Sequence, residues 1–270
     1  MYINGHLNSS ISAVDRGFSL GDGFFTTIHI QNGLPLFWQY HQQRLLTTAH
    51  RLGFSVPDTN DLYHQLIRLA QQADSQSLCG KIVISRGAGG RGYSPAGCNQ
   101  PTTVVSIHPY PLQYHDWQKS GIAIGIAEQR LGIQPILAGL KTLNRLEQVM
   151  LKAELDRRNL LEAVVLNVSE NVVECVTANL FWRKNGVIYT PDLQRSGVCG
   201  VMRAAIMECC LNHRLSVKQL DASLSELLRA DEVWISNALM GVVPVTAIDQ
   251  QQYHQTETAR WLQNEFEQIV

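Results

Sequence analysis

The chain has 270 residues, of which 45% are hydrophobic and 17% are charged, and its formal net charge is −1 at pH 7. This is the composition of an ordinary globular protein, and the length exceeds the roughly 100–200 residues usual for one domain, so we expect one large or two moderate domains. The near-neutral charge, without any basic block, argues against a surface for nucleic acid or anionic membrane.

The first residues resemble the start of a strand and a turn, with neither the basic nor the apolar region of a signal peptide. No apolar run approaches the ~20 residues of a membrane span. The six cysteines and nine histidines show no metal-ligand spacing. We therefore expect no metal site, and we expect reduced thiols in a cytoplasmic protein.

Turn signals and hydrophobic periodicity predict an α+β first half. Asn4-Gly5 and Asn32-Gly33 each lie between short runs of strand-forming residues, which is typical of β-hairpins. Two amphipathic helices and two further strands follow. The expected elements are a hairpin at residues 4–5, a hairpin that pairs 26–31 with 34–37, helices over 40–52 and 61–73, strands over 81–85 and 103–108, and a glycine-rich loop over 86–93.

Residues 111–120 are expected to form a linker, because prolines at the start of this region precede a mixture of polar and aromatic residues. The linker would separate an N-terminal α+β domain, residues 1–110, from a C-terminal domain, residues 121–270. The elements expected beyond it are strands over 122–126, 163–167, 172–183, 187–190 and 231–236, helices over 144–157, 202–212 and 258–269, and a short helix capped by Ser223. The apolar side of the helix over 144–157 is expected to comprise Leu146, Val149, Met150 and Ala153.

The most informative segments are residues 137–145, Leu-Ala-Gly-Leu-Lys-Thr-Leu-Asn-Arg, and residues 174–182, Glu-Cys-Val-Thr-Ala-Asn-Leu-Phe-Trp. The first places Lys141 in a glycine-containing turn ahead of a helix, and the second places Glu174 on a strand. An amine that forms a Schiff base with an aldehyde, and a carboxylate that pairs with a pyridinium nitrogen, are the groups that pyridoxal phosphate requires. Each residue alone is more commonly a solvated turn lysine or a surface glutamate, so only the pair supports this hypothesis.

Two glycine-rich segments are candidates for binding a phosphate. Residues 196–203, Ser-Gly-Val-Cys-Gly-Val-Met-Arg, run into a helix, so the amides of Val201 and Met202 would lie in a first turn, where an anion is stabilised. An ordinary loop-to-helix junction is the alternative. The loop over 86–93 leads into Ser-Pro rather than a helix, and we interpret it as a mobile loop near a site.

Six motifs together resemble the fold-type IV pyridoxal-phosphate enzymes, the family of the branched-chain and D-amino-acid aminotransferases. They follow the family's order from the first hairpin to Pro244-Val245. The resemblance implies an α+β fold of two domains, a smaller N-terminal α/β sandwich and a larger C-terminal domain with a β-barrel-like core. It also implies a homodimer. The motifs are Leu-Gly-Asp-Gly-Phe-Phe-Thr-Thr at 20–27, His-Gln-Gln-Arg-Leu at 41–45, Ser-Arg-Gly-Ala-Gly-Gly-Arg-Gly-Tyr at 85–93, Gly-Leu-Lys-Thr-Leu-Asn-Arg-Leu at 139–146, the segment at 174–182, and Gly-Val-Met-Arg at 200–203.

The resemblance implies a role for each matching residue. Lys141 is the Schiff-base lysine and the proton-transfer base, and Glu174 pairs with the pyridinium nitrogen of the cofactor. From the residues alone, Arg44 would be interpreted as a helix-surface arginine. The other implied cofactor ligands are Arg44, the Val201 and Met202 amides and the turn of Asn237, Ala238 and Leu239 for the phosphate, with Asn144 and Arg145 near the ring hydroxyl.

Within the family, three motifs resemble the lyase branch, whose members eliminate pyruvate from 4-amino-4-deoxychorismate to give 4-aminobenzoate for folate synthesis. These motifs are Phe-Thr-Thr at 25–27, Gly-Gly-Arg-Gly-Tyr at 89–93 and Lys-Thr-Leu-Asn-Arg at 141–145. Aminotransferases usually carry Phe-Glu-Gly where this chain has Phe25-Thr26-Thr27, and a hydroxyl at Thr27 can reach toward the leaving group. The lyase branch usually has a histidine where this chain has Thr142, whose side chain we expect to point away from the cofactor ring.

Other substrate contacts and other functions remain open at this point. Arg91 and Tyr110 are candidates for binding the substrate carboxylates, with a solvated arginine and a domain-junction tyrosine as the alternatives. An aminotransferase of the same fold is the second functional hypothesis. A catalytically silent protein that binds the cofactor or a partner is the third, and the presence of both Lys141 and Glu174 disfavours it.

Overall fold

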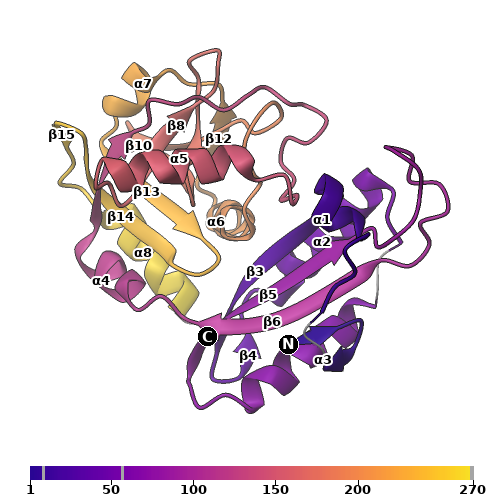
Figure 1. Cartoon of the computed structure of the whole chain (residues 1–270). Helices are drawn as coiled ribbons and strands as arrows, with labels where there is room; N and C mark the ends of the chain where they lie inside the picture. The colour runs from indigo at the N-terminus through magenta and orange to yellow at the C-terminus, as the bar shows by residue number, and fades with distance from the viewer. Residues whose placement is uncertain (8–9, 56–57, 268–270) are drawn as a thin grey trace. The chain divides into compact units, whose positions relative to one another are not determined.

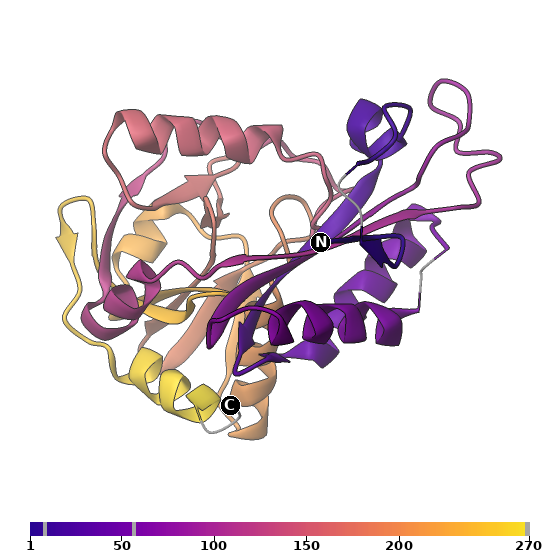
Figure 2. The ribbon, with the colours of Figure 1, turned by 60° about the horizontal axis from the view of Figure 1, so that its bottom comes forward.

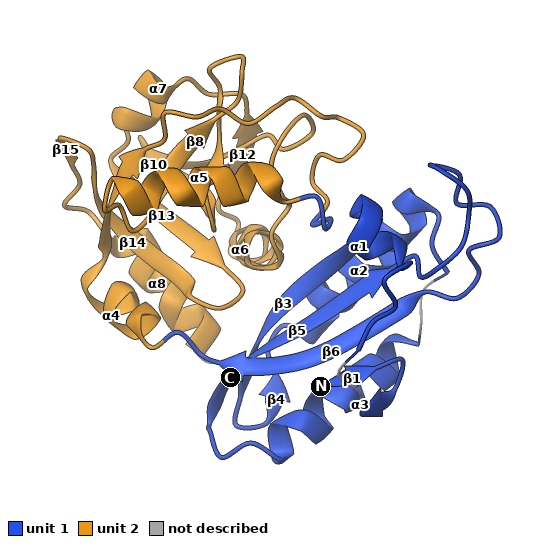
Figure 3. Cartoon of the chain, viewed as in Figure 1, with its two compact units in different colours: residues 1–111, 141–144 blue, residues 112–140, 145–270 orange. Residues whose placement is uncertain are grey.

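The computed structural model describes residues 1–7, 10–55 and 58–267, and the chain divides into two compact units (Figure 3). Unit 1 comprises Met1–Pro111 and Lys141–Asn144, and unit 2 comprises Leu112–Leu140 and Arg145–Val270. The segment that carries Lys141 therefore belongs to unit 1, although unit 2 precedes and follows it in the sequence. Among the helices of the described residues, none has the length and apolar character needed to cross a membrane.

Unit 1 is an antiparallel sheet of six strands in the order β2-β1-β6-β5-β3-β4 (Figure 1). The two predicted hairpins are confirmed, because each Asn-Gly pair has the positive φ angles that such tight turns require. The elements are β1 (Tyr2–Ile3), β2 (His6–Leu7), α1 (Arg16–Leu20), β3 (Gly23–Gln31), β4 (Leu34–Pro35), α2 (Trp38–Leu52), α3 (Thr59–Gln71), β5 (Ser77–Ser85) and β6 (Thr102–Pro109).

Strand alternation gives the sheet of unit 1 two different faces. On one face, Phe24, Ile28 and Ile30 of β3 are buried against α2 and α3, which lie along this side of the sheet (Figure 2). The intervening β3 residues, including Phe25 and Thr27, lie on the other face and are only partly buried. The helices therefore cover one face of the sheet and form a core with it, whereas the side chains of the other face remain partly exposed.

Unit 2 contains a mixed sheet in the order β12-β11-β10-β13-β14-β7-β8-β9, with β15 paired to β14. Buried residues from its strands form one core, in which Val172 of β9 joins Leu180 of β10 and Ile122 of β7, so the sheet curves around this core. This half-barrel confirms the barrel-like core expected for the larger domain. The elements are α4 (Gln113–Ser120), β7 (Ile122–Ile126), α5 (Leu146–Arg157), β8 (Ala163–Leu166), β9 (Val172–Cys175), β10 (Asn179–Lys184), β11 (Val187–Pro191), α6 (Val201–Asn212), β12 (Val217–Leu220), α7 (Leu224–Leu228), β13 (Glu232–Asn237), β14 (Gly241–Ile248), β15 (Gln251–Gln252) and α8 (Glu257–Glu267).

The structure differs from the sequence expectations at two segments of unit 2. Most of residues 111–120, expected to be a linker, forms helix α4. The single strand expected over 172–183 is two strands, β9 and β10. The buried carboxylate of Glu162 accepts hydrogen bonds from the Val176 and Thr177 amides, at 2.8 and 3.0 Å, and so holds the turn that interrupts this strand.

The predicted apolar side of α5 was wrong. Leu146, Val149 and Met150 are 71%, 61% and 53% exposed, whereas Leu151 and Leu155 are buried. Both sets recur at helical spacing, so periodicity alone could not choose between them. The orientation of α5 depends on Glu154, which lies on the same side as Leu151 and Leu155. Its carboxylate can be buried there because it accepts hydrogen bonds from the Glu128 and Gln129 amides.

Glu154 is a buried carboxylate with a full set of donors. The Glu128 and Gln129 amides donate to it at 2.8 and 3.1 Å, and Arg158 Nη1 donates at 2.6 Å. Burial by itself would raise the pKa of Glu154, but these hydrogen bonds outweigh it and the pKa lies below the ordinary 4.5. A group whose pKa is lowered by folding stabilises the protein above its ordinary pKa, and the contribution disappears as pH falls through the folded value.

We predict that Glu154→Gln lowers the free energy of unfolding by about 1–3 kcal/mol at pH 7, because the Glu128 and Gln129 amides and Arg158 lose their charged acceptor. The difference from wild type should shrink as pH falls below 4.5, and denaturant unfolding over this range measures it. The matched control is Glu170→Gln, which removes an ion pair to Arg130 from a carboxylate that is 68% exposed. That control should leave the free energy of unfolding close to the wild-type value, because solvent screens an exposed ion pair. Equal losses for both variants would contradict the assignment.

Candidate functional site

Lys141 is attached to unit 1 through backbone pairing with β3. Its carbonyl accepts the Phe25 amide at 3.0 Å, and the Leu143 amide donates to the Gly23 carbonyl at 2.9 Å. Thr142 lies opposite Phe24 in the same bridge, and both side chains are buried. Because neighbouring residues of an extended chain point in opposite directions, Lys141 points to the partly exposed face of the sheet. The backbone therefore determines the direction of this amine.

Several reactive side chains share that face of unit 1. Lys141 Nζ lies 4.8 Å from the centre of the Phe25 ring, and Lys81 Nζ lies 5.1 Å from the same centre. Thr27 follows Phe25 by two residues on β3 and is directly opposite Lys81 on β5. The structure thus brings Lys141, Thr27 and Lys81 to one surface around an aromatic ring. Lys81 was missed in the sequence, where it is an unremarkable strand lysine.

The two adjacent threonines of β3 have different surroundings. Thr26 is fully buried on the helix side of the sheet, and its hydroxyl lies 2.6 Å from His41 Nδ1 on α2. Arg44 Nη1 donates to the same hydroxyl at 3.5 Å. The His-Gln-Gln-Arg-Leu motif is therefore joined to the Thr-Thr pair by side-chain contacts, and Thr27 alone faces the surface that carries Lys141.

His41 is buried, and this lowers its pKa well below the ordinary 6.5. The positive charge of Arg44 adds to the effect. The imidazole is consequently neutral at physiological pH, which leaves Arg44 as the charged group of this motif. A guanidinium held by a buried neutral pair is suited to binding an anion.

Asn144 has a structural partner within unit 1. Its Nδ2 donates to the Gly21 carbonyl at 3.1 Å, and a Cβ added to Gly21 would lie 2.6 Å from Asn144 Oδ1. Glycine at position 21, with φ +65°, therefore allows Asn144 to hold the segment that carries Lys141. The adjacent Asp22 binds Arg16 and Arg86 at 2.9 and 2.8 Å, so an ion pair joins the Gly-Asp-Gly motif to the Ser-Arg-Gly motif.

Glu174 is a buried carboxylate on β9 of unit 2. Its Oε2 accepts a hydrogen bond from the Val198 amide at 2.9 Å, and Glu174 is 5% exposed. Gly197 has φ +85°, and a Cβ there would lie 2.7 Å from Val173 and 3.2 Å from Glu174 Oε2. The loop before α6 therefore passes closely over the strand that presents Glu174, which only glycine allows.

Asn179 connects the same loop to the start of α6. Its Nδ2 donates to the Val198 carbonyl at 2.8 Å, and its Oδ1 accepts the Gly200 amide at 3.0 Å. Gly200 is the N-cap of α6, and glycine has no side chain that could accept a hydrogen bond from the first turn. The Val201 and Met202 amides lie in that first turn. Asn179 was missed as a site residue in the sequence, although it lies within the quoted motif at 174–182.

Arg145 belongs to unit 2 and lies close enough to Glu174 to interact with its charge. Burial lowers the pKa of Arg145, while the Glu174 and Glu147 carboxylates oppose this effect. The structure therefore places a half-buried positive charge near the carboxylate of β9.

The turn at Asn237–Leu239 is shaped by the side chain of Asn237. Its Oδ1 accepts the Leu239 and Met240 amides at 2.9 and 2.8 Å, and its Nδ2 donates to the Thr177 carbonyl at 3.1 Å. Ala238 lies between Asn237 and Leu239, and its methyl side chain has no polar atom that could compete for the backbone amides. Asn237 thus positions the turn by binding its backbone.

The two candidate carboxylate ligands, Arg91 and Tyr110, differ in exposure. Arg91 is exposed in the loop between β5 and β6 and forms an isolated bridge with Ser94. Tyr110 is buried and its ring stacks on His29, with 4.4 Å between the ring centres. Unit 1 also contains a pocket of about 420 Å³ lined by Ile11, Phe18, Val104 and Leu143, and none of the predicted site residues lines it.

Comparisons with known proteins identify the relatives of this chain. The sequence model of the family described as amino-transferase class IV matches residues 23–248. An aminodeoxychorismate lyase from Vibrio harveyi is 42% identical over 247 residues, which are 92% of this chain and 90% of that protein. The crystal structure of 4-amino-4-deoxychorismate lyase from Pseudomonas aeruginosa is 35% identical, with a TM-score of 0.92 over 100% of this chain and 98% of that chain.

A more distant structure shows that the fold extends beyond these lyases. A hypothetical aminotransferase from Mycobacterium tuberculosis, in its PLP-bound form, has a TM-score of 0.84 at 16% identity and covers 98% of this chain and 94% of that one. The matched region 23–248 contains the motifs at 41–45, 139–146 and 200–203. The chain belongs to the class IV aminotransferase family, the fold-type IV enzymes.

Proposed function

We propose that the protein is an aminodeoxychorismate lyase that uses pyridoxal 5'-phosphate to eliminate pyruvate from 4-amino-4-deoxychorismate and give 4-aminobenzoate. The observation that carries the proposal is the pair Thr26-Thr27 on β3, of which only Thr27 shares the face with Lys141. The identity to the Vibrio harveyi and Pseudomonas aeruginosa lyases over nearly the whole chain supports the same function. Formation of 4-aminobenzoate for folate synthesis follows from this activity.

The donor set of the chain fits the cofactor. Lys141 supplies an amine for the aldehyde, and the buried Glu174 supplies an acceptor for a protonated ring nitrogen. Arg44 and the first-turn amides of α6 supply positive charge and N–H donors for a phosphate. The proposed ligands also include Asn144 and Arg145, near the hydroxyl of the cofactor ring, and the turn Asn237–Leu239, for the phosphate.

When bound, pyridoxal phosphate would supply an aldehyde for the substrate amino group and an electron-withdrawing ring. Lys141 Nζ is the proposed base that takes the proton from the carbon bearing that amino group. The buried carboxylate of Glu174 would hold a proton on the ring nitrogen by accepting its N–H. The carbon–oxygen bond to the enolpyruvyl group breaks, the substrate ring becomes aromatic, and the departing enol takes a proton to become pyruvate.

Thr27 is proposed as the group that assists this departure. Its hydroxyl can donate to the oxygen that leaves, and Lys141 can return the proton afterwards. Lys81 lies opposite Thr27 and places a fixed positive charge on the same face, where a substrate carboxylate would be attracted. Arg91 and Tyr110 remain candidate carboxylate ligands.

The activity can be tested directly with purified protein and 4-amino-4-deoxychorismate. We expect equal amounts of 4-aminobenzoate and pyruvate. Amination of a keto acid in a parallel reaction, without elimination, would instead identify an aminotransferase. Absence of both products would identify a protein that only binds the cofactor or a partner.

Lys141→Ala is expected to abolish the visible absorbance of the covalently bound cofactor and to lower turnover at least about a thousandfold, because one amine serves as both tether and base. Absorbance spectra and the product assay measure the two effects. The matched control is Lys152→Ala, which removes an exposed lysine paired with Asp156 on α5 and should leave both unchanged. Normal elimination by Lys141→Ala would refute the assignment.

Thr27→Val keeps the shape of the side chain and removes its hydroxyl. We expect kcat to fall about 10- to 100-fold, with a much smaller change in KM, because the hydroxyl acts on the departing group. Thr27→Ser restores the hydroxyl and should recover most of the rate. If the valine variant turned over at the wild-type rate, Thr27 would have no part in the elimination.

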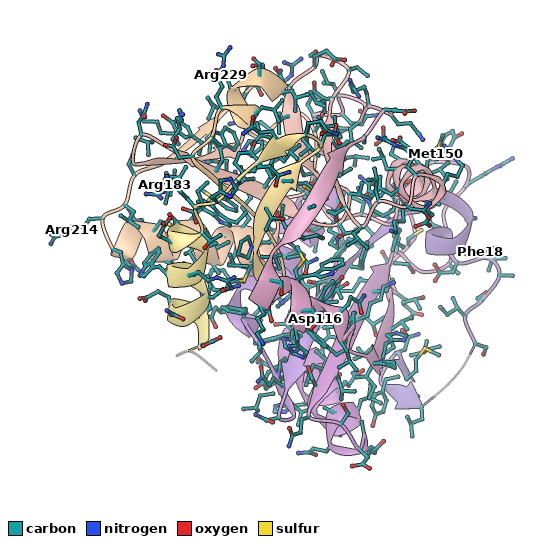
Figure 4. The ribbon with its side chains drawn as sticks, turned by 90° about the vertical axis from the view of Figure 1, so that its left-hand side faces the viewer. Phe18, Asp116, Met150, Arg183, Arg214 and Arg229 are labelled. Atoms are coloured by element: carbon teal, nitrogen blue, oxygen red, sulfur yellow. The ribbon has the colours of Figure 1, made fainter. Side chains whose placement is uncertain are left out.

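We also propose that the protein is a homodimer in the cytoplasm. Leu146, Val149 and Met150 form an exposed apolar stripe on α5, and Met150 is labelled on this helix in Figure 4. Exposed apolar surface of this kind is typical of protein–protein contacts. None of the six cysteines, which all lie in the described part of the chain, forms a disulfide, and this supports a reducing compartment.

The dimer can be tested by light scattering coupled to gel filtration. The wild type is expected to have the mass of two chains, and Val149→Glu should shift it toward one, because a charge would be buried at the contact. Leu211→Glu changes an equally exposed apolar residue on α6, 73% exposed, and should leave the mass unchanged. A monomeric wild type would refute the proposal.

A further inference from the structure

Three side chains with metal-binding atoms meet where the end of α6 approaches α8 in unit 2. Cys209 lies in the last turn of α6, His213 is the residue that ends this helix, and Glu265 lies on α8. Their potential ligand atoms all lie within 4.8 Å of one another. Cys209 and His213 are four residues apart, so the helix presents them on one side. This cluster lies at the opposite end of α6 from Gly200 and is not used in the proposed elimination.

The hydrogen bond of His213 determines which ring nitrogen can act as a ligand. Nδ1 lies 3.0 Å from the Cys209 carbonyl, which can only accept, so Nδ1 carries the hydrogen and donates it. In the neutral ring, Nε2 then has a lone pair. A histidine whose other nitrogen donates to a backbone carbonyl is the usual arrangement of a metal ligand. The edge-on packing of Trp261 against His213, with 5.1 Å between ring centres, further restricts the imidazole.

Glu265 faces this lone pair. Its Oε2 lies 3.5 Å from His213 Nε2, so two electron-pair donors are directed at each other unless a cation lies between them. A proton on Nε2 satisfies the contact as an ion pair, but it gives no role to the third group. Cys209 Sγ lies 3.9 Å from the same imidazole, on its Nδ1 side, and the ligand atoms of the three residues lie within 4.8 Å of one another. Rotation of the Cys209 side chain can bring the thiol to a cation held between Nε2 and Glu265, whereas a simple ion pair gives the thiol no part.

The spacing of the cluster is close to that of a zinc site. Ligands about 2.0–2.3 Å from zinc in a tetrahedral arrangement lie about 3.4–3.6 Å from one another. The separation of 3.5 Å between His213 and Glu265 already has this value, and rotation of the half-buried Cys209 side chain adjusts the remaining contact. A thiolate, a neutral imidazole and a carboxylate together balance the charge of a divalent ion.

In contrast to the expectation from the sequence that there is no metal site, we propose that Cys209, His213 and Glu265 bind a divalent transition-metal ion, with zinc as the expected metal and water as a fourth ligand. The ion joins the end of α6 to α8 and so stabilises the folded protein by mass action. Arg214, labelled in Figure 4, follows His213 and points away from the ribbon, so its charge is directed to solvent. The proposal does not depend on the proposed elimination reaction.

The experiment titrates the full-length holoenzyme, first treated with a chelator, with Co²⁺ and with Zn²⁺. Co²⁺ should bind in a 1:1 ratio and give the thiolate charge-transfer absorbance of a cysteine ligand, and Zn²⁺ should displace it and raise the unfolding temperature. Cys209→Ser should remove the absorbance, and Glu265→Gln should weaken binding more than about tenfold. Both variants should unfold at the wild-type temperature in chelator and keep the basal activity.

The matched control is Cys98→Ser, which removes another partly buried cysteine, in unit 1. It should bind Co²⁺ like the wild type. The cofactor can itself chelate metals, but that binding would persist in Cys209→Ser. A wild type without thiolate absorbance, or an unchanged titration in both Cys209→Ser and Glu265→Gln, would overturn the proposal and leave the His213–Glu265 contact as an ion pair.

Discussion

The backbone pairing between residues 141–143 and β3 is the constraint on which the proposed chemistry depends. Lysine side chains are long and flexible, but the Phe25 amide and Gly23 carbonyl hold the main chain on both sides of Thr142. Extended backbone then directs Lys141 toward Phe25 and Thr27, while Thr142 is buried beside Phe24. A catalytic amine is precise only when the atoms that support it are fixed.

A second constraint acts on Glu174 in unit 2. The carboxylate accepts a hydrogen bond from the Val198 amide. Asn179 binds the Val198 carbonyl and the Gly200 amide, at the start of α6. The strand that carries Glu174 and the helix that carries the proposed phosphate-binding amides are therefore connected by hydrogen bonds, two of which are buried. Such bonds are costly to leave unsatisfied, so the two parts are expected to keep one arrangement.

The choice between elimination and amino transfer depends on small differences within one fold. The class IV family includes aminotransferases, and the fold is shared at 16% identity by an aminotransferase structure. What favours the lyase is the replacement of a Phe-Glu-Gly pattern by Phe25-Thr26-Thr27 and the close similarity to named lyases. The structure adds a reason for the first threonine, since Thr26 is buried against His41 while Thr27 remains available.

The sequence alone determined the local features that depend on short-range chemistry. The sequence correctly predicted the Asn-Gly turns, the end of the helix over 40–52, the helix cap at Ser223 and most strands. Turn geometry and capping involve neighbouring residues, so they can be recognised from short segments. The motifs around Lys141 and Glu174 also indicated the family, which the comparisons confirmed. For the individual site residues, the sequence supplied candidates and their chemistry.

Tertiary structure decided what depends on distant residues. The buried side of α5 could not be predicted, since Glu154 is tolerated inside only because Glu128, Gln129 and Arg158 donate to it. Glu162 likewise interrupts the strand expected over 172–183 by capturing two amides 14 and 15 residues away. Lys81, Asn179 and the group of Cys209, His213 and Glu265 gain their significance only from neighbours brought together by folding. Hydrogen bonds and burial between segments far apart in sequence leave no periodic signal, and this is why the sequence could name Lys141 but could not say which side chains surround it.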